Sequence, residues 1–435
     1  MINALAVRFL VLPAVGLFLF TCREDNIRKN LSTTAASTSE KAQSAYDFVN
    51  SIGVNTHLNY FDRTYGDFPL VQRELSAIGI RHVRDGVHLL NADYNQAVYS
   101  RWSQLGAIGI RFDAVLDPRS DLGPITSDKL DQVNQLAGQT IESFEGPNEL
   151  DISNISSWPS VDRDYQEDIY RSVEAMSSTK STAVVGPSLA FASKGSYVGD
   201  ISDRITYGNL HPYPAGKMPS TIFPEQPLLA KELSNGKKIF VTESGYHNAL
   251  NDHRDQPAIS ESAAAKYIPR LFLENFLQGI PRTYLYEFLD EAADPGLANF
   301  QMHWGLVRSD GSRKPAFTAV NNLISELNDV VEPVSLQEMT YSLDIENQQV
   351  HHLLLQKSNG QFFLIFWQEV PSYDEKNQQD VSVSPQLIHL NLAHNARNID
   401  IYEPSVQSQP LHVYANVTTI PLDVPDHPLV VQVTP

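Results

Sequence analysis

The chain has 435 residues, 42% of them hydrophobic and 19% charged, which is typical of a globular protein and excludes a disordered one. Its formal net charge of −19 at pH 7 argues against nucleic acid as a partner, because polyanions are bound by basic surfaces. The single cysteine, Cys22, excludes a disulfide within the chain and a cysteine-rich metal site.

Residues 1–22 resemble an export signal. Arg8 precedes an apolar run from Phe9 to Phe20, which is short for a membrane-spanning helix but suits a signal peptide. The last residues, Leu19-Phe20-Thr21-Cys22, partly resemble a bacterial lipobox, so lipidation of Cys22, ordinary secretion and an uncleaved anchor all stay open. We therefore expect an exported protein that is secreted, periplasmic or membrane-anchored outside the cytoplasm, and any attachment to a membrane would be through the N-terminus only. Residues 23–44 are polar and predict a flexible tether.

The next part of the chain, residues 45–330, alternates apolar strand-like runs with segments of helical spacing such as Tyr165–Met176 and Ala263–Gln278. Eight strands are predicted in residues 48–58, 82–84, 112–116, 140–144, 182–186, 207–210, 239–242 and 283–288.

A near-repeat supports this interpretation. The motif Leu75-Ser76-Ala77-Ile78-Gly79-Ile80-Arg81 recurs as Leu105-Gly106-Ala107-Ile108-Gly109-Ile110-Arg111, and in each copy a glycine separates a helical segment from a strand. Repeated βα units of this kind over the length of the segment predict a (β/α)8 TIM barrel. An open doubly wound sheet is the alternative, but the chain lacks the glycine-rich phosphate loop common in that fold, and we expect no cofactor.

Residues 331–435 change in character. Strand-like runs such as Phe362–Trp367 and Leu429–Val433 alternate with polar turns, and no helical pattern of any length appears. This predicts a C-terminal antiparallel β-sandwich domain. Packing against the barrel is the expected role of this domain, and independent sugar binding is the alternative.

Two glutamates stand just past the ends of predicted strands. Glu149 follows the fourth strand within Phe144-Glu145-Gly146-Pro147-Asn148-Glu149, and Glu243 follows the seventh strand, Ile239–Thr242. Because functional residues of such barrels lie at the carboxyl ends of the strands, both side chains are expected at one mouth of the barrel. Two carboxyl groups facing each other are what hydrolysis of a glycosidic bond requires.

With Asn148-Glu149 after the fourth strand and Glu243 after the seventh, the chain resembles the retaining β-glycosidases of glycoside hydrolase clan A, nearest to their xylosidase and endoglycanase families. The resemblance implies that Glu149 is the acid/base and Glu243 the nucleophile in a double displacement at a β-glycosidic bond, with an oligosaccharide, polysaccharide or glycoside as substrate. Burial and the neighbouring negative charge are expected to raise the pKa of Glu149.

Further candidates lie at other strand ends, where they would contact substrate or catalytic residues. Asn148 is expected to bind the sugar 2-hydroxyl. Arg84 either holds Glu243 ionised or forms an inter-strand salt bridge. His211 and Tyr213 follow the sixth strand. The resemblance implies that a histidine or tyrosine there orients the nucleophile or touches the sugar, and a structural role is the alternative. Tyr286 ends the eighth strand, and Trp304 lies in the loop after it. Trp304 is the better candidate for a sugar platform, and burial in the core is the alternative.

Glu287, next to Tyr286, is expected on the same rim. Other carboxylates could bind substrate hydroxyls but lack the Asn-Glu context, namely Glu142, Glu145, Asp117, Asp290 and Glu291. Glu243-Ser244-Gly245 is not the G-x-S-x-G of a serine hydrolase, and the 13 histidines form no H-E-x-x-H motif, so no metal site is predicted. The leading hypothesis is an exported retaining glycoside hydrolase. A catalytically silent barrel that binds carbohydrate or serves as a surface scaffold is the alternative.

Overall fold

The computed structural model describes residues 37–435, except 121, 176–181, 224, 255 and 334. Eight parallel strands follow one another in the order β7-β6-β5-β4-β3-β10-β9-β8. A parallel bridge between Val185 and Tyr207 joins the two ends of this order and closes the barrel. The strands are β3 (Ile52–Asn55), β4 (His82–Gly86), β5 (Arg111–Val115), β6 (Ile141–Glu145), β7 (Ala183–Val185), β8 (Gly208–Leu210), β9 (Ile239–Ser244) and β10 (Thr283–Leu285). The predicted barrel is confirmed, and the open sheet is not observed.

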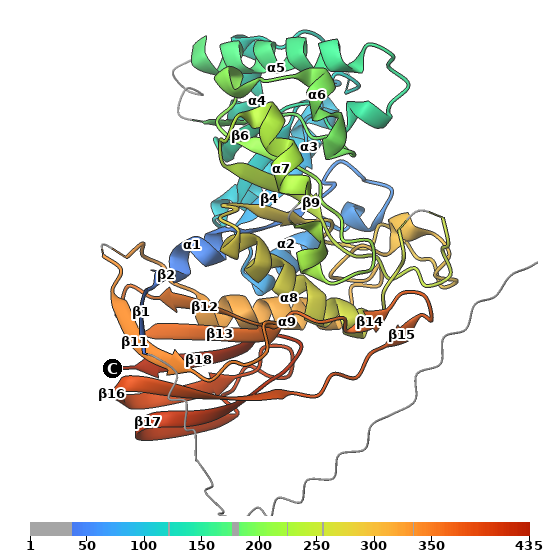
Figure 1. The fold of residues 1–435 in the computed structure, drawn as a ribbon. Helices are drawn as coiled ribbons and strands as arrows, with labels where there is room; N and C mark the ends of the chain where they lie inside the picture. The colour runs from blue at the N-terminus through green and yellow to red at the C-terminus, as the bar shows by residue number, and fades with distance from the viewer. Residues whose placement is uncertain (1–36, 121, 176–181, 224, 255, 334) are drawn as a thin grey trace, which may run out of the picture. The chain divides into compact units, whose positions relative to one another are not determined.

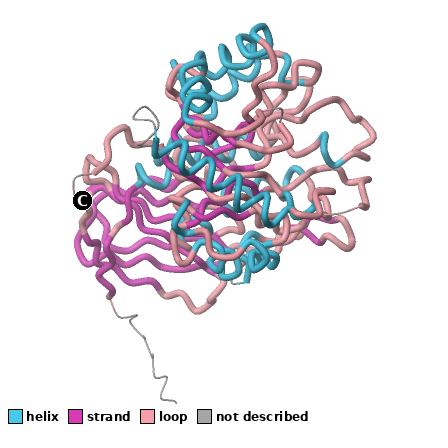
Figure 2. Tube along the Cα trace, turned by 90° about the horizontal axis from the view of Figure 1, so that it is seen from above, coloured by secondary structure: helices cyan, strands magenta, loops and turns pink. Residues whose placement is uncertain are grey.

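Helices surround the barrel strands, as seen from above in Figure 2. They are α1 (Ala45–Asn50), α2 (Phe68–Ile78), α3 (Ala92–Ala107), α4 (Ser127–Leu136), α5 (Trp158–Ala175), α6 (Gly195–Val198), α7 (Glu225–Ser234), α8 (Glu261–Leu277) and α9 (Pro315–Leu327). Short 3-10 turns occur at η1 (Thr64–Gly66), η2 (Leu150–Ile152), η3 (Ala192–Lys194), η4 (Ser202–Arg204), η5 (Pro219–Ile222) and η6 (Phe300–Met302).

The near-repeat of the sequence corresponds to two successive helix-to-strand turns. Gly79 ends α2 with φ of 83°, and Gly109 follows α3 with φ of 95°. Only glycine adopts this left-handed backbone at little cost, so the chain can leave each helix and enter β4 or β5 directly. Between the layers, the Trp102 ring of α3 stacks on Phe112 of β5 with 4.2 Å between ring centroids, and both side chains are fully buried.

The main sheet of the C-terminal domain is mixed, mostly antiparallel, with the order β1-β11-β16-β18-β13-β12-β2, to which β17 adds by pairing with β16, and β14 and β15 form a separate pair. Its long strand β16 pairs with β11 through its first part and with β18 through its last part, so apolar side chains of both parts share one core. The C-terminal strands are β11 (Glu338–Leu343), β12 (Val350–Gln356), β13 (Phe362–Gln368), β14 (Tyr373–Asp374), β15 (Gln379–Asp380), β16 (Gln386–Tyr402), β17 (His412–Val424) and β18 (Leu429–Thr434). The predicted C-terminal β domain is thus present, with mixed rather than purely antiparallel pairing.

Two N-terminal strands complete this sheet. β1 (Thr38–Lys41) pairs antiparallel with β11, and β2 (Gln43–Ser44) pairs parallel with β12. Figure 1 shows the blue β1 beside the orange β11. This differs from the expectation that residues 23–44 form a tether. Both strands lie at ends of the strand order, and β1 is held by its backbone ladder and by polar contacts such as Ser39 Oγ to Glu338 at 2.7 Å and His352 to Glu40 at 3.3 Å. Their polar side chains therefore carry no apolar strand pattern. The predicted signal, residues 1–22, lies outside the described residues.

Polar groups join the barrel to the β-sheet domain through α8. The buried Arg270 donates from Nε to Oε2 of Glu369 at 2.8 Å. Trp367 of β13 donates from Nε1 to Glu274 of α8 at 2.8 Å. Because these groups are withdrawn from water, each depends on its partner in the other domain. Among the described residues, no helix combines the length and apolar character needed to cross a bilayer.

Candidate active site

Glu149 and Glu243 meet at the carboxyl ends of the barrel strands. Glu243 is near the end of β9, and Glu149 follows β6 after the turn at Gly146-Pro147. One carboxylate oxygen of each lies within 4.8 Å of the other. The side chain of Glu149 is 20% exposed and that of Glu243 is 12% exposed, so both are mostly withdrawn from water yet reachable. This separation suits a retaining glycosidase, in which the carboxyl groups are about 5–5.5 Å apart, better than an inverting one.

Arg84 lies at the centre of the site, and its guanidinium has all five N–H donors engaged. Nε and Nη2 each donate to a different oxygen of Glu145 at 2.8 Å. Nη1 donates to Oε1 of Glu243 at 2.6 Å and to Oδ1 of Asn55 at 2.9 Å. The last donor, from Nη2, reaches Oδ1 of Asn148 at 2.8 Å. Arg84 therefore forms the inter-strand salt bridge and also contacts Glu243, so the two interpretations of its role are compatible.

The amide of Asn148 is oriented by this contact. Since its oxygen accepts from Arg84, its nitrogen remains as the donor. The backbone N–H of Asn148 donates to Oδ2 of Asp117 at 3.0 Å, and Arg119 donates to the backbone oxygen of Asn148. The loop after β5, which contains Asp117 and Arg119, thus holds the Asn-Glu segment in place.

His211 and Tyr213, from the loop after β8, contact the two glutamates. The Tyr213 hydroxyl donates to Oε2 of Glu243 at 2.8 Å. Nδ1 of His211 lies 2.8 Å from Oε1 of Glu149 and 3.7 Å from Oε2 of Glu243. On the other side of the ring, Nε2 lies 2.8 Å from the Thr242 hydroxyl, which donates to Asn209 at 2.7 Å. Because that hydroxyl has one proton and donates it to Asn209, Nε2 of His211 donates to Thr242.

The pKa of Glu149 differs from the expectation. Burial acts to raise this pKa, but the hydrogen bond and the charge of His211 outweigh burial and lower it below 4.5. Burial acts to lower the pKa of His211, but the charges of Glu243 and Glu149 outweigh it and raise that pKa above 6.5. The expected raised pKa of Glu149 is therefore not found for this residue by itself. Instead, Glu149 and His211 share a proton across the contact at Nδ1.

A cavity of about 550 Å³ opens in front of these groups. Arg84, Asn148 and Glu243 line it from one side, and His57 and Tyr60, from the segment after β3, line it from another. The His57 and Tyr60 rings are stacked with centroids 4.6 Å apart. The cavity falls within the usual range of about 300–1,000 Å³ for small-molecule sites and combines polar groups with aromatic faces, as sites for sugars require.

The aromatic candidates at the eighth strand form two layers. Tyr286 is half-buried, and its hydroxyl lies 3.2 Å from Nε2 of His57. Trp304 is only 4% exposed and packs edge-on against Tyr213 and Tyr286, with centroids 5.3 and 5.7 Å away. Tyr286 therefore faces the site, whereas Trp304 lies behind Tyr213 and Tyr286 and supports them.

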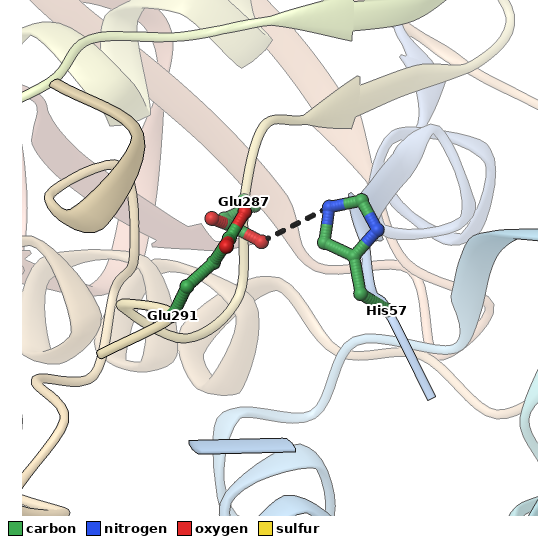
Figure 3. A group of neighbouring side chains, drawn as sticks. All are labelled: His57, Glu287 and Glu291. Carbon is green, nitrogen blue, oxygen red and sulfur yellow. Dashed lines mark ion pairs between the residues drawn. The ribbon is translucent and has the colours of Figure 1, made fainter. Parts of the chain in front are cut away.

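A second cluster of titratable side chains, distinct from the one around Glu149 and Glu243, includes His57 of the cavity lining (Figure 3). His57 approaches from the segment after β3, and Glu287 and Glu291 lie side by side in the segment after β10. Nε2 of His57 is 3.3 Å from Oε2 of Glu287, which also accepts from the Tyr65 hydroxyl at 3.0 Å. Burial lowers the pKa of His57 to about 4 and, together with the charge of Glu291, raises the pKa of Glu287 well above its usual range. His57 is therefore uncharged at neutral pH, and burial favours the protonated form of Glu287.

Two groups in the described part of the chain bring potential metal ligands within 4.8 Å of one another: His57 with Glu287 and Glu291, and His211 with Glu149 and Glu243. In both groups hydrogen-bond contacts between protein atoms already engage a histidine nitrogen, at 3.2 Å in the first and 2.8 Å in the second. Both groups are thus held at least in part by contacts between protein side chains.

The remaining carboxylates divide between the site and the scaffold. Glu145 lies directly beneath Arg84, a role that its sequence context did not indicate. Glu142 pairs with His82 and Arg282, each at 2.7 Å, and Asp290 pairs with Lys314 at 2.8 Å. Sequence analysis also missed His57 and Asn55, although both stand at the end of the first barrel strand, and that position is the signal that could have identified them.

No protein-family model and no curated protein matches the chain. Solved structures do match it. A family 39 glycoside hydrolase from the gut symbiont Bacteroides cellulosilyticus WH2 has a TM-score of 0.61 and 16% identity, with 90% of this chain and 83% of that chain covered. A family 39 enzyme from Xanthomonas axonopodis pv. citri has 0.58 and 13%, with 91% and 96% covered. A monomeric beta-xylosidase from Caulobacter crescentus CB15 has 0.58 and 13%, with 91% and 98% covered.

The chain has the fold of family 39 glycoside hydrolases. The likeness extends over the barrel and the β-sheet domain, because it covers about nine-tenths of the chain. The resemblance to clan A, inferred from Asn148-Glu149 and Glu243, is thereby confirmed at the level of the fold. At 13–16% identity it is a statement about architecture, and the chemistry must be argued from the site itself.

Proposed function

We propose that this protein is a retaining glycoside hydrolase that cleaves a β-glycosidic bond with Glu149 as acid/base and Glu243 as nucleophile. One observation carries the proposal: two carboxylates from the carboxyl ends of the non-neighbouring strands β6 and β9 lie within 4.8 Å of each other at a cavity that Glu243 lines, and each contacts its own partners. Arg84 and Tyr213 donate to Glu243, and His211 contacts Glu149.

In the first step, an oxygen of Glu243 bonds to the anomeric carbon as the bond from that carbon to the leaving oxygen breaks. The leaving oxygen takes the proton shared by Glu149 and His211, passed on through Glu149. Arg84 and Tyr213 orient the carboxylate of Glu243, and the nitrogen of Asn148 is available to the sugar 2-hydroxyl, a contact that strengthens in the transition state. Tyr60 and His57 offer aromatic and polar surface to the same sugar ring, and the Tyr286 hydroxyl contacts Nε2 of His57.

In the second step, water attacks the anomeric carbon and gives its proton to Glu149, and the electron pair of the bond to carbon returns to Glu243. Both steps invert the anomeric carbon, so the product keeps the configuration of the substrate. A β-xyloside is a reasonable first substrate, since one of the similar structures is a beta-xylosidase.

The experiment is turnover of a panel of aryl β-glycosides, followed by NMR of the first-formed anomer. We expect turnover and a β-anomer first. Glu243→Gly should abolish turnover, and added azide should restore part of it and yield an α-glycosyl azide, because the anion occupies the place of the missing carboxylate. A first-formed α-anomer, or a Glu243→Gly variant with near-normal rate, contradicts the assignment.

The alternative, a silent carbohydrate-binding barrel, is favoured if saturating sugar binds but no glycoside in the panel is cleaved. Export stays a prediction from residues 1–22, which can be checked by locating the full chain in cell fractions.

A further inference from the structure

Glu145 is a fully buried member of the charge network around the two proposed catalytic glutamates. Its side chain is 0% exposed. It accepts two of the five guanidinium donors of Arg84, and a third donor of Arg84 goes to Glu243. The Arg84 guanidinium thus donates hydrogen bonds both to the buried carboxylate of Glu145 and to the carboxylate of Glu243, which lines the cavity.

The surroundings of Glu145 are built to hold a negative charge. Oε1 accepts from Nδ2 of Asn209 at 2.9 Å and lies 3.2 Å from the Thr242 hydroxyl. Asp113 of β5 lies beside Glu145, and its Oδ1 accepts from Ser143 at 2.5 Å. Burial and the charge of Glu145 raise the pKa of Asp113 well above its usual range, which favours the neutral form of Asp113 beside an ionised Glu145. Burial acts to raise the pKa of Glu145, but Arg84 outweighs it, and the net direction is downward.

We propose that Glu145 is a positioning residue that acts through Arg84. Its negative charge keeps the guanidinium paired with an anion while Glu243 alternates between carboxylate and glycosyl ester. This inference rests on the proposed glycosidase function.

The reason lies in the two chemical steps. When Glu243 bonds to the anomeric carbon and the leaving oxygen takes the proton from Glu149, Glu243 loses its negative charge. Arg84 would then be a buried cation without an anion, which is costly in a low dielectric, unless Glu145 remains ionised beneath it. When water later displaces Glu243, the electron pair returns to its oxygen, and Arg84 again has two anions. Glu145 therefore shares the cation in the free enzyme and neutralises it alone in the intermediate.

Without the charge of Glu145, the whole cation would act on Glu243. The carboxylate of Glu243 would be a weaker nucleophile but a better leaving group, so formation of the glycosyl-enzyme should slow and its hydrolysis should not.

The charged or titratable groups that face Arg84, Glu145 or Glu243 come from several elements, namely Asp113 on β5, Tyr284 on β10, His57 after β3, Glu149 after β6, and His211 and Tyr213 after β8.

The test is Glu145→Gln in the full chain, with the aryl β-glycoside that the wild type cleaves best. A dinitrophenyl 2-deoxy-2-fluoro-glycoside of that sugar separates the two steps, because its inactivation rate reports formation of the glycosyl-enzyme and reactivation of the trapped enzyme reports hydrolysis. We expect inactivation to slow about tenfold to a hundredfold and reactivation to be unchanged or faster. The acidic limb of the kcat/KM profile should move about one to two pH units lower, as removal of a charge across a guanidinium implies.

Glu142→Gln is the matched control. Glu142 is another mostly buried carboxylate of β6, paired with Arg282 at 2.7 Å, but it does not contact Arg84. This variant should lose stability without moving the acidic limb or changing the ratio of the two rates. Should Glu145→Gln not fold, Glu145→Asp applies the same test, since the shorter side chain keeps the charge but withdraws it from Arg84, and the limb should move part of the way.

Equal slowing of both steps with an unmoved acidic limb, or a limb that moves to higher pH, overturns the inference, because it would mean that Glu145 only keeps Arg84 in place. Absence of a trapped glycosyl-enzyme in the wild type would instead contradict the proposed function itself, so the two failures are distinguishable.

Discussion

Nδ1 of His211 lies 2.8 Å from Oε1 of Glu149, while Nε2 of the same ring donates to Thr242. The ring is therefore fixed on one side, and only the proton at Nδ1 can move toward the glutamate. In a pair coupled this closely, the protons are lost at pH values that belong to the pair and not to either residue. The acid that protonates the leaving group is thus Glu149 together with His211.

This relationship predicts the pH profile of His211→Asn. In the wild type, the basic limb of kcat/KM should lie above pH 6.5, because the two glutamates raise the pKa of His211 above that value. In the variant the proton is held by Glu149 alone, so the basic limb should move to lower pH by about one unit or more. An unmoved basic limb in His211→Asn would show that the pair does not share this proton.

Glu149→Ala should lose activity according to the leaving group. Glycosides with poor leaving groups need protonation, and their kcat/KM should fall at the upper end of the typical acid/base contribution of about 10²–10⁴. A dinitrophenyl glycoside needs little protonation, so its first step should suffer far less. The comparison of two substrates on one variant is its own control. If both substrates lose activity equally, Glu149 is not the general acid.

Glu287→Gln should change how stability depends on pH. Because burial raises the pKa of Glu287 above 4.5, the folded wild type holds a proton there that the unfolded chain releases. Its contribution to the free energy of unfolding is complete below pH 4.5 and declines as pH rises, by up to about 1.4 kcal/mol per pH unit. Glutamine carries no such proton, so urea unfolding between pH 5 and 8 should show a shallower decline in the variant. Parallel curves would contradict the buried neutral acid.

Arg270→Met should strongly destabilise the protein, because it leaves Glu369 buried without its cation. The two side chains are 0% and 2% exposed and approach to 2.6 Å. Loss of one partner of such a pair costs about 3–5 kcal/mol. Arg270→Met combined with Glu369→Met should recover part of this loss, since no charge is then stranded. A double variant as unstable as the sum of its single variants would mean that the pair does not couple the barrel to the β-sheet domain.

The alternation of helices and strands and the order of the eight barrel strands could be predicted from the amino-acid sequence. These features are local: glycines such as Gly79 and Gly109 end helices through their backbone freedom, and apolar runs mark buried strands. Placing Asn148, Glu149 and Glu243 at strand ends required no more than this, because a parallel barrel brings all its strand ends to one mouth.

How the groups at that mouth are connected depends on the closed barrel. The four residues that accept hydrogen bonds from Arg84 lie on other segments distant in sequence, and no local pattern distinguishes Glu145, which holds that arginine, from Glu142, which pairs with Arg282. The same limit explains why β1 was taken for tether, why Trp304 proved to lie behind Tyr286, and why the pKa of Glu149 is lowered. Each of these depends on which side chains meet across the closed barrel or at a sheet edge, and that is set by packing between distant segments and not by the residues on either side in the chain.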